Sequence, residues 1–490
     1  MPPAYKPAVH ARRPFPFRSR LRSPRLPGLI AAAVLAGCSS LQPSPPAGDT
    51  PAPPLPTSWQ GSAPAAESTG DGLAGGAWQG FADPLLAALV DEALAANLDL
   101  QTAQARLAQA RALVDVAAAG QQPTLGSSAS AGRSRSSNQT GNSLRVGLDA
   151  SWEADLFGAN AAATRAARAG AESSAATLQA TRLAVAAETA LAYVAWQGVR
   201  EQLRVAEASL ASQRQTLELV QARVSSGLAD HLELQQANST LEQVQARVPA
   251  LRLTLAQNEH ALALLLGQPP AALSARLAAA PQALPRAPAL PALPLPAELL
   301  RRRPDLRAAE LQIDAELATL AQTEAQRKPS FTLSGNLALQ AATLAGLGHA
   351  AALVAGLAAG VDWTIFDAGA GAARVAAQRA ALDLARIAWR SAVLVALQDV
   401  EDGLAALALG EQRVATLQRA SAAADEAASF ARIRWQAGLT DFTTLLDAER
   451  SALNAGDSLA SARTDLASAH IRLLKSLGGG IGIPSSALSS

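Results

Sequence analysis

The pattern of apolar and polar positions changes period several times along the chain. In three segments of about ten residues the two kinds of side chain alternate strictly, and a fourth segment alternates weakly; this pattern is typical of strands with one buried face. The clearest segment has on one face Leu144, Val146, Leu148, Ala150 and Trp152, and on the other Arg145, Gly147, Asp149, Ser151 and Glu153. Residues 331–340 and 353–363 alternate likewise, while residues 124–133, mostly Ser and Gly, give the weakest pattern. Together these segments predict four strands in two hairpins.

Elsewhere the pattern is helical. Residues 84–119 have the period of an amphipathic helix, and two much longer helical runs occupy residues 160–224 and 370–436. The first long run would extend on the order of 100 Å. Apolar residues recur every seven positions late in the first run and in the segments that follow both runs: Leu203, Leu210, Leu217 and Val224; Leu234, Leu241, Val248, Leu255 and Leu262; Leu445, Ala452, Leu459, Leu466 and Leu473. This repeat predicts antiparallel helices packed as left-handed coiled coils.

The chain contains two tandem copies of one unit. The sequence from Trp152 to Gly158 recurs from Trp363 to Gly369, 211 residues later, and the turn at residues 227–230 recurs at 438–441 with the same offset. Upstream of the strands the offset is 206 residues. The second copy therefore holds five additional residues, which we expect in a loop between its strands. A Pro-rich segment, residues 281–296, joins the copies.

A glycine-containing turn separates each long helix from its returning partner. The two turns read SSGLAD and QAGLTD. Gly227 and Gly438 are expected to adopt a positive φ there. Asp230 and Asp441 follow the turns and are predicted to be helix N-caps.

The N-terminus has the order of a secretory signal, with a basic region, an apolar run at residues 29–36 and then small residues. Leu35-Ala36-Gly37-Cys38 matches the bacterial lipobox, in which the cysteine thiol receives a diacylglyceryl group and becomes the acylated N-terminus after cleavage. Ser39 behind the cysteine favours sorting to the outer membrane. Two or more acyl chains attach a protein stably to a membrane. The alternative is that Cys38 is a buried cysteine after an ordinary signal peptide.

Composition favours long helices over compact globular domains. Of the 490 residues 49% are hydrophobic but only 3% are aromatic, so the large side chains that fill compact cores are scarce. A single cysteine excludes a disulfide framework and any multi-cysteine metal site. The five histidines are scattered, and no catalytic or phosphate-binding motif is present. We therefore expect no enzyme activity, no metal and no cofactor other than the covalent lipid.

The formal net charge of +1 conceals an uneven distribution. Residues 1–37 hold seven basic residues and no acidic one, and the rest of the chain carries 34 basic residues against 40 acidic ones. The mature chain is therefore mildly acidic. It has no basic stripe interleaved with aromatics, which argues against binding of nucleic acid.

These features divide the chain into six segments. They are a signal peptide (1–37), a lipidated Pro- and Gly-rich tether (38–82), a first repeat (83–280), a Pro-rich linker (281–297), a second repeat (298–478) and a C-terminal tail (479–490). The tether has too few large apolar residues to bury a core and is expected to be extended.

Four strands of membrane-spanning length cannot close into a barrel on their own. The smallest barrels need about eight strands, and an open edge is not tolerated in lipid. Several chains must therefore pool their strands, and three chains would supply twelve. Trp152, Phe331 and Trp363 lie at strand ends, where interfacial aromatics are expected. The alternative is that these rings only pack the hairpin ends.

The two-fold repeat, the lipobox, the segment from Trp152 to Gly158 and the segment Arg301-Arg302-Arg303-Pro304-Asp305-Leu306 together resemble the TolC-type outer membrane factors. More narrowly, they are similar to the NodT branch of outer membrane lipoproteins that serve RND efflux pumps. The resemblance spans roughly residues 55–478. It implies a mainly α-helical channel-tunnel: a homotrimer with a twelve-stranded β-barrel in outer membrane lipid, continued by an α-helical barrel into the periplasm.

The resemblance further implies a passive exit duct for small molecules, with a periplasmic membrane fusion protein and an inner-membrane RND pump as partners. Asp447 falls at the family's gating aspartate, and Thr444 stands where some members carry a second aspartate one turn earlier. The alternative for Asp447 is a solvated helix charge. Contacts with the fusion protein are expected at Gly227, Leu228, Gly438 and Leu439, although both leucines are also candidates for hydrophobic pins of the turns.

Two other functions stay open at this point. One is the outer channel of a type I protein secretion system, against which the lipobox and the R-R-P-D-L segment weigh. The other is a trimeric periplasmic coiled-coil scaffold that conducts nothing, which leaves the alternating strands unexplained. The exported substrate and the particular pump and adaptor are not predicted by the sequence.

Overall fold

The computed structural model describes residues 59, 81–136, 139–285, 296 and 302–478. The chain divides into two units, residues 1–50 and 51–490, and every described residue belongs to the second. The predicted signal peptide, Cys38 and the C-terminal tail lie outside the described residues, as do most of the tether and most of the linker.

Two long antiparallel helix pairs make up most of the described structure. In the first pair α4 (Ala159–Ser225) turns back into α5 (His231–Leu265), and in the second α9 (Ala370–Gln436) turns back into α10 (Phe442–Ser476). Both long helices begin and end within one residue of the predicted runs. Most of the heptad positions lie in apolar clusters between helices, as Leu210 does against Val248. The sequence period therefore identified the packing seam as well as the helices.

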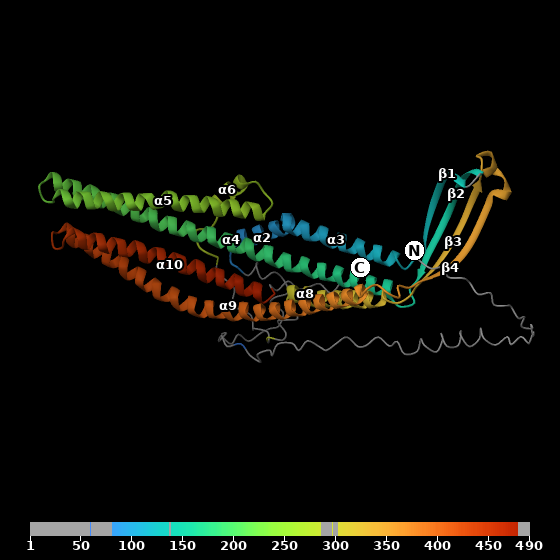
Figure 1. The fold of residues 1–490 in the computed structure, drawn as a ribbon. Helices are drawn as coiled ribbons and strands as arrows, with labels where there is room; N and C mark the ends of the chain where they lie inside the picture. The colour runs from blue at the N-terminus through green and yellow to red at the C-terminus, as the bar shows by residue number, and fades with distance from the viewer. Residues whose placement is uncertain (1–58, 60–80, 137–138, 286–295, 297–301, 479–490) are drawn as a thin grey trace, which may run out of the picture. The chain divides into compact units, whose positions relative to one another are not determined.

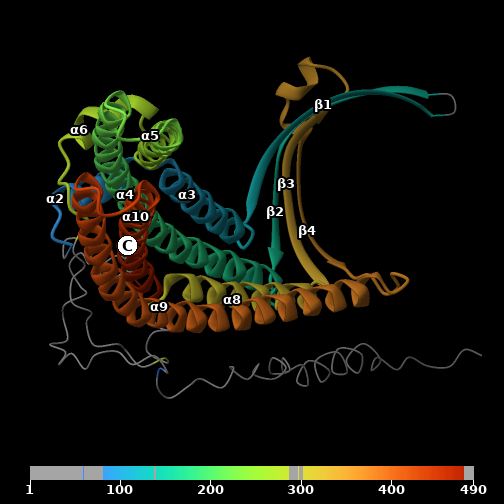
Figure 2. The ribbon, with the colours of Figure 1, turned by 90° about the vertical axis from the view of Figure 1, so that its left-hand side faces the viewer.

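The two pairs lie side by side because α4 packs along α10 (Figure 2). Gly198 of α4 stands directly against Thr464 of α10. A Cβ atom added at Gly198 would lie 2.3 Å from the Thr464 hydroxyl oxygen, so the helices approach here as closely as only glycine allows. This contact is one of several that join the first repeat to the second, since α4 also packs on α8 and β2 pairs with β3.

The predicted single helix over residues 84–119 is wrong, because the segment forms two helices. These are α2 (Pro84–Ala96) and α3 (Leu98–Ala119), separated by Asn97 in an extended conformation with φ −61° and ψ 134°. The Asn97 carboxamide oxygen accepts the N–H groups of Asp99 and Leu100 at 2.9 and 3.1 Å. The Asn97 side chain thus accepts backbone N–H groups that a continuous helix would bond internally. The apolar pattern nevertheless continues through the break.

Shorter elements join the repeats. After α5 the chain forms a 3₁₀ turn, η3 (Pro270–Leu273), and α6 (Ser274–Ala278), which the sequence did not predict. The second repeat continues with α8 (Pro304–Ala325), which packs against α4 and α9. Within the described ranges, no helix is both long and apolar enough to cross a membrane.

The four strands form one antiparallel sheet in the order β1 (Thr124–Ser136), β2 (Gln139–Ala154), β3 (Ser330–Ala341) and β4 (Leu353–Asp362). The prediction of four strands in two hairpins is confirmed. The β3–β4 loop contains two 3₁₀ turns, η4 (Ala345–Gly348) and η5 (Ala350–Ala352), in the region where the sequence placed the five additional residues. The sheet lies at one end of the long helices and the helical turns lie at the other (Figure 1).

The strand register sorts the sheet into two chemically different faces. Leu148 pairs with Leu337, which in turn pairs with Ala355, and Val146 pairs with Leu339. These apolar side chains are largely exposed: Val146 is 51% exposed, and Leu357 on β4 is 79% exposed. The other face carries the polar positions of β2 and β3, while β4 adds mainly glycine and small apolar residues to it. The described chain therefore leaves one apolar sheet face, and the edges of β1 and β4, without a partner of its own.

Candidate functional site

The two helical turns have the same geometry. Gly227 and Gly438 have φ values of +71° and +69°, as the sequence suggested. The N–H of Leu228 donates to the Arg223 carbonyl at 2.8 Å, and the N–H of Leu439 donates to the Arg434 carbonyl at 2.8 Å. These 6→1 hydrogen bonds close each long helix in a Schellman motif, which requires a left-handed residue at the glycine.

Each return helix begins at an aspartate. Asp230 accepts the N–H of Glu233 at 2.9 Å, and Asp441 accepts the N–H of Thr444 at 2.7 Å. Hydrogen bonds from Thr444, together with one from the Thr443 hydroxyl, lower the pKa of Asp441 below its ordinary value, because they stabilise the charged carboxylate. Both aspartates are therefore N-caps that fix the start of α5 and α10.

The leucines of the turns point away from the helix core. Leu228 is 70% exposed and Leu439 is 68% exposed. Neither belongs to the buried cluster beneath the turns, which is formed by Val220, Ala237, Ala431, Trp435, Phe442, Leu445 and Leu446. The leucines therefore do not act as buried pins, and they are free to contact another molecule.

Asp447 lies on the exposed side of α10, with 78% of its side chain exposed and the nearest cation, Arg450, at 4.0 Å. It lines a shallow groove of about 320 Å³ between α5 and α10, together with Gln235, Gln236, Ser239, Thr443, Leu446 and Arg450. Thr444 is not among these residues, and its amide is engaged in the Asp441 cap. The structure thus places Thr443, rather than Thr444, in the same groove as Asp447.

Sequence reasoning did not find the contacts that join the two turns. Arg223, near the end of α4, donates from Nη1 to the carbonyl of Trp435 at 3.0 Å, and its guanidinium lies 4.8 Å from the Trp435 ring centroid. Trp435 in turn packs against Phe442 at 5.5 Å. Arg223 and Trp435 are distant in sequence. Only the comparison of the two repeats, which places both residues near the end of a long helix, could have suggested that they meet.

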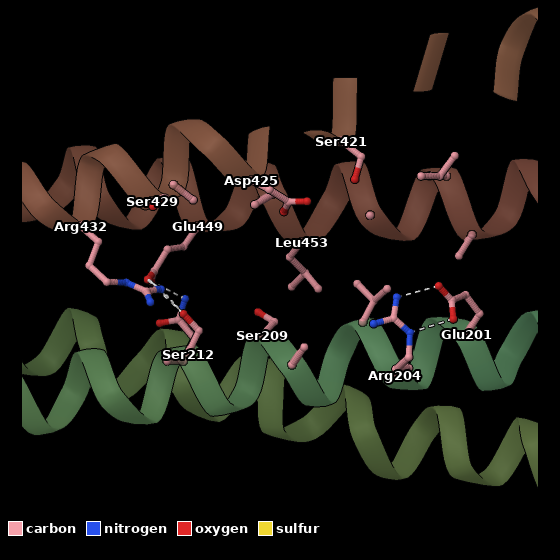
Figure 3. Close-up of a pocket in the computed structure, with 18 of the residues that line it drawn as sticks. Glu201, Arg204, Ser209, Ser212, Ser421, Asp425, Ser429, Arg432, Glu449 and Leu453 are labelled. Atoms are coloured by element: carbon pink, nitrogen blue, oxygen red, sulfur yellow. Dashed lines mark hydrogen bonds and ion pairs between the residues drawn. The ribbon is translucent and has the colours of Figure 1, made fainter. Parts of the chain in front are cut away.

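A second missed residue is Glu449, a buried acid two positions after Asp447. Its carboxylate lies between α4, α9 and α10, where Arg432 reaches toward it from α9 and Ser212 from α4 (Figure 3). The adjoining groove has a volume of about 460 Å³ and is lined by polar side chains such as Asp425 and Ser429 together with apolar ones such as Ile433 and Leu453. The sequence signal that could have indicated Glu449 is an acidic residue at a helix position that faces the neighbouring helix pair.

The aromatics at the sheet ends are tied to the helix–strand junctions. The Trp152 indole N–H donates to the Gln121 carbonyl at 3.0 Å, and that of Trp363 donates to the Arg327 carbonyl at 3.3 Å. Gln121 and Arg327 are equivalent in the two repeats. The two indoles are 39% and 56% exposed, so each has its polar edge held by the chain and a ring face left open.

Phe331 lies at the same end of the sheet. Its ring is 6.4 Å from that of Phe157, over which the Lys328 ammonium sits at 5.1 Å. The three predicted aromatics therefore share the end of the sheet nearest the helices. Among the described residues, no group of three or more His, Cys, Asp or Glu side chains is arranged to hold a metal ion.

The R-R-P-D-L segment has a structural explanation. Arg303, only 11% exposed, precedes α8 and forms ion pairs with Asp305 at 2.8 Å and with Asp399 of α9 at 3.3 Å. Its Nη1 also donates to the carbonyl of Ser476, the last residue of α10, at 3.4 Å. Burial acts to raise the pKa of Asp305, but the hydrogen bond and charge of Arg303 outweigh it and hold that pKa below its ordinary value.

Comparison with known proteins identifies the family. The model of the outer membrane efflux protein family matches residues 89–268 and 295–479. The chain is 29% identical to Nodulation protein T of Rhizobium leguminosarum bv. viciae, over 86% of this chain and 87% of that protein. It is 30% identical to the solvent efflux pump outer membrane protein SrpC of Pseudomonas putida, over 82% and 86% of the two chains. The solved outer-membrane channel OprN superposes with a TM-score of 0.78 at 33% identity, covering 88% of this chain and 98% of OprN.

The chain belongs to the outer membrane efflux protein family. The predicted resemblance, the channel-type fold, the efflux function and the outer membrane location are thereby confirmed. The family is one of channel components and is not a known enzyme family.

Proposed function

We propose that this protein is the outer membrane exit duct of a tripartite RND-type efflux system, through which small molecules pass from the periplasm or the pump to the exterior. The observation that carries the proposal is the placement of one sheet with an exposed apolar face at the end of two 67-residue helices. A lipid-facing wall and a long helical wall are thereby built into each repeat. The duct performs no chemistry of its own, and the energy comes from the pump.

The active form is proposed to be a homotrimer. The sheet has two unpaired edges, β1 and β4, which lipid does not tolerate. Joining β4 of one chain to β1 of the next removes both edges, and three chains give a twelve-stranded barrel, an even number as in other outer-membrane barrels. The six long helices and their partners would then continue the barrel into the periplasm.

The helical turns are the proposed periplasmic tip. Leu228 and Leu439 are exposed there on rigid Schellman turns, which suits them to contact a membrane fusion protein that links the duct to its pump. Three copies of Asp447 around the trimer axis would form the gate, where like charges repel one another or hold a cation. Thr444 supplies no second carboxylate, so this gate has one acidic ring.

A lipid on Cys38 is the proposed anchor of the mature N-terminus. The lipobox places the cysteine at the cleavage site, and two or more acyl chains give stable attachment. Replacing Cys38 with Ser should abolish incorporation of radiolabelled palmitate while leaving a folded protein. Unchanged labelling of the Cys38→Ser variant would contradict the anchor.

Deleting the gene and restoring it on a plasmid tests the function. The deletion strain should accumulate a fluorescent small-molecule pump substrate, and the restored strain should expel it. A type I secretion channel would instead be revealed by loss of a secreted protein without a change in dye accumulation. A non-conducting scaffold would change neither quantity, and either of these outcomes would contradict the efflux proposal.

A further inference from the structure

Two arginines on β1 lie on the apolar face of the sheet. The β1–β2 register pairs Arg133 with Asn142 and Arg135 with Thr140. Residues that are directly paired, and residues two apart on one strand, point to the same face of a sheet. Both arginines therefore share the face of Leu144, which follows Asn142 by two residues on β2. Both are exposed.

No acidic side chain of the four strands shares this face with the arginines. The register places every acidic residue of the strands on the opposite face: Asp149, Glu153 and Asp362. On that opposite face the one arginine of β2, Arg145, is paired with Asp149 at 3.1 Å. Among the described residues, by contrast, the guanidinium groups of Arg133 and Arg135 form no ion pair. Two positive charges are therefore left without neutralisation on a face that is otherwise apolar.

The arginines lie at the end of the apolar face that is farthest from the helices. β1 starts close to the helices, after α3 ends at Ala119, and runs away from them (Figure 1). On β2 the apolar positions extend over the nine residues from Trp152 to Leu144, and a strand needs about 9–11 residues to span a membrane. The next pair outward on the same face is Asn142 with Arg133. Both guanidinium groups thus fall at the outer interface, where a lipid-facing arginine is tolerated far better than at the middle of a bilayer.

The second repeat shows that the strand does not require these charges. The residues equivalent to Arg133 and Arg135, 206 positions later, are Leu339 and Ala341, and both are apolar. They lie in β3, which pairs on both sides as a regular strand. The arginine pair therefore belongs to the first repeat alone. Each chain has one pair, and the proposed trimer has three.

The pair has the chemistry of a phosphate site. Positions two apart on a strand are separated by about 7 Å, so two long side chains can approach one group from two directions. The planar fork of a guanidinium matches two phosphate oxygens at once. The Thr140 hydroxyl and the Asn142 carboxamide are exposed on the same face and add neutral donors.

We propose that Arg133 and Arg135 bind the phosphate group of a phosphorylated glycolipid in the outer leaflet of the outer membrane. The surface itself points to a lipid. Its arginines complement a negative headgroup, and the apolar side chains next to them toward the helices, among them Leu144 and Val146, suit acyl chains. A free phosphate ion would use only the arginines. The inference rests on the proposed function in one respect, because it needs this sheet face to lie in lipid.

Native mass spectrometry of the purified full chain tests the proposal. The probe is bisphosphorylated lipid A, and its dephosphorylated form is the control lipid. The wild type should bind the phosphorylated form about tenfold more tightly or better, because hydrogen bonds between charged groups are lost with the phosphate. The Arg133→Gln/Arg135→Gln double variant should bind both forms alike. Arg133→Lys/Arg135→Lys should keep part of the preference, since lysine retains the charge but not the fork.

Arg145→Gln is the matched control. It removes one positive charge from the neighbouring strand, but Arg145 lies on the opposite face and is paired with Asp149. This variant should prefer phosphorylated lipid A as the wild type does. An equal loss of preference in Arg145→Gln would overturn the proposal, because the overall charge of the sheet would then be sufficient.

The remaining outcomes separate the proposal from the proposed function. Equal binding of the two lipids by the wild type would overturn the phosphate site and leave the duct intact, since the apolar face alone would then hold lipid. Displacement of lipid A by an equal concentration of inorganic phosphate would show that the site takes a free anion and would overturn the choice of a lipid. Failure of the wild type to bind either lipid and to insert into lipid vesicles would overturn the lipid-facing sheet, and with it the duct.

Discussion

Asp447 of α10 and Gln236 of α5 occupy the same position in the two repeats, 211 residues apart, and both side chains line one groove near the helical turns. The two repeats therefore contribute equivalent positions to one groove, and at this position only the second repeat carries a charge. In the proposed trimer this gives three carboxylates at the tip rather than six. The proposed gate is therefore a property of the second repeat, and the first repeat supplies its neutral neighbour.

Removing the charge of Asp447 should change the ion selectivity of the duct. A ring of aspartates favours cations at a constriction, so Asp447→Asn should lower the cation-to-anion permeability ratio and weaken block by divalent cations. The measurement is the reversal potential in a salt gradient. Gln236→Ala, at the equivalent position, should leave the ratio unchanged. Equal selectivity of Asp447→Asn and the wild type would remove Asp447 from the gate.

Acidification should loosen the first turn of α10. The pKa of Asp441 is lowered by hydrogen bonds from Thr444 and Thr443, so the cap stabilises the helix above the ordinary aspartate pKa and is lost as the pH falls through the lowered value. Hydrogen exchange at the Thr444 amide, corrected for its intrinsic rate, should therefore accelerate in acid. Asp441→Asn keeps an N-cap that does not titrate, and its protection should be independent of pH. A similar acid dependence in that variant would show that another group is responsible.

Arg303 should contribute to stability through its three partners. Arg303→Ala leaves Asp305, Asp399 and the Ser476 carbonyl without their donor, and hydrogen bonds to charged groups are each worth about 1.5–3 kcal/mol, so a loss of about 2 kcal/mol is expected. Arg303→Lys should rescue little, because an ammonium cannot reproduce the fork of a guanidinium. Denaturant unfolding measures both.

Arg302 provides the control for that prediction. Its side chain is exposed, so Arg302→Ala should change the free energy of unfolding by less than about 0.5 kcal/mol. An equal loss for both arginines would mean that the basic run acts through its overall charge and not through the contacts of Arg303.

The crossing of α4 and α10 should not tolerate a side chain at Gly198. Gly198→Ala places a Cβ atom against Thr464, and such overpacking costs about 1–3 kcal/mol. Adding Thr464→Ala removes the two atoms nearest to that Cβ and should restore most of the loss. Gly170 of the same helix has open space around it, and Gly170→Ala should stabilise the protein by about 0.5–1 kcal/mol. Equal effects at the two glycines would contradict the close approach.

Periodicity and duplication predicted most of the fold. The seven-residue repeat located the seams of the long helices, and strict alternation located the strands, because each pattern follows the geometry of its backbone. The break at Asn97 was missed since apolar residues continue across it. Asn97 is the repeat equivalent of Arg303, and its Nδ2 donates to the carbonyl of Leu265, the equivalent of Ser476, at 2.8 Å. Comparing the two copies at this position would have indicated that both repeats have a polar residue here that contacts the end of the return helix.

The candidate site was predicted in part. The turns, their glycines and the capping aspartates follow from local sequence, because their hydrogen bonds connect residues that are close along the chain. The contacts of Glu449 and Arg223 join helices more than two hundred residues apart. No local pattern names a partner at that distance, so these links needed the structure.

Conductance of the purified protein in planar bilayers tests the central claim most directly. An outer membrane duct gated at its helical turns should give stepwise currents, rare in the wild type and more frequent after Asp447→Ala. A complete absence of current in the wild type and in this variant, from protein that is folded and assembled, would contradict the account.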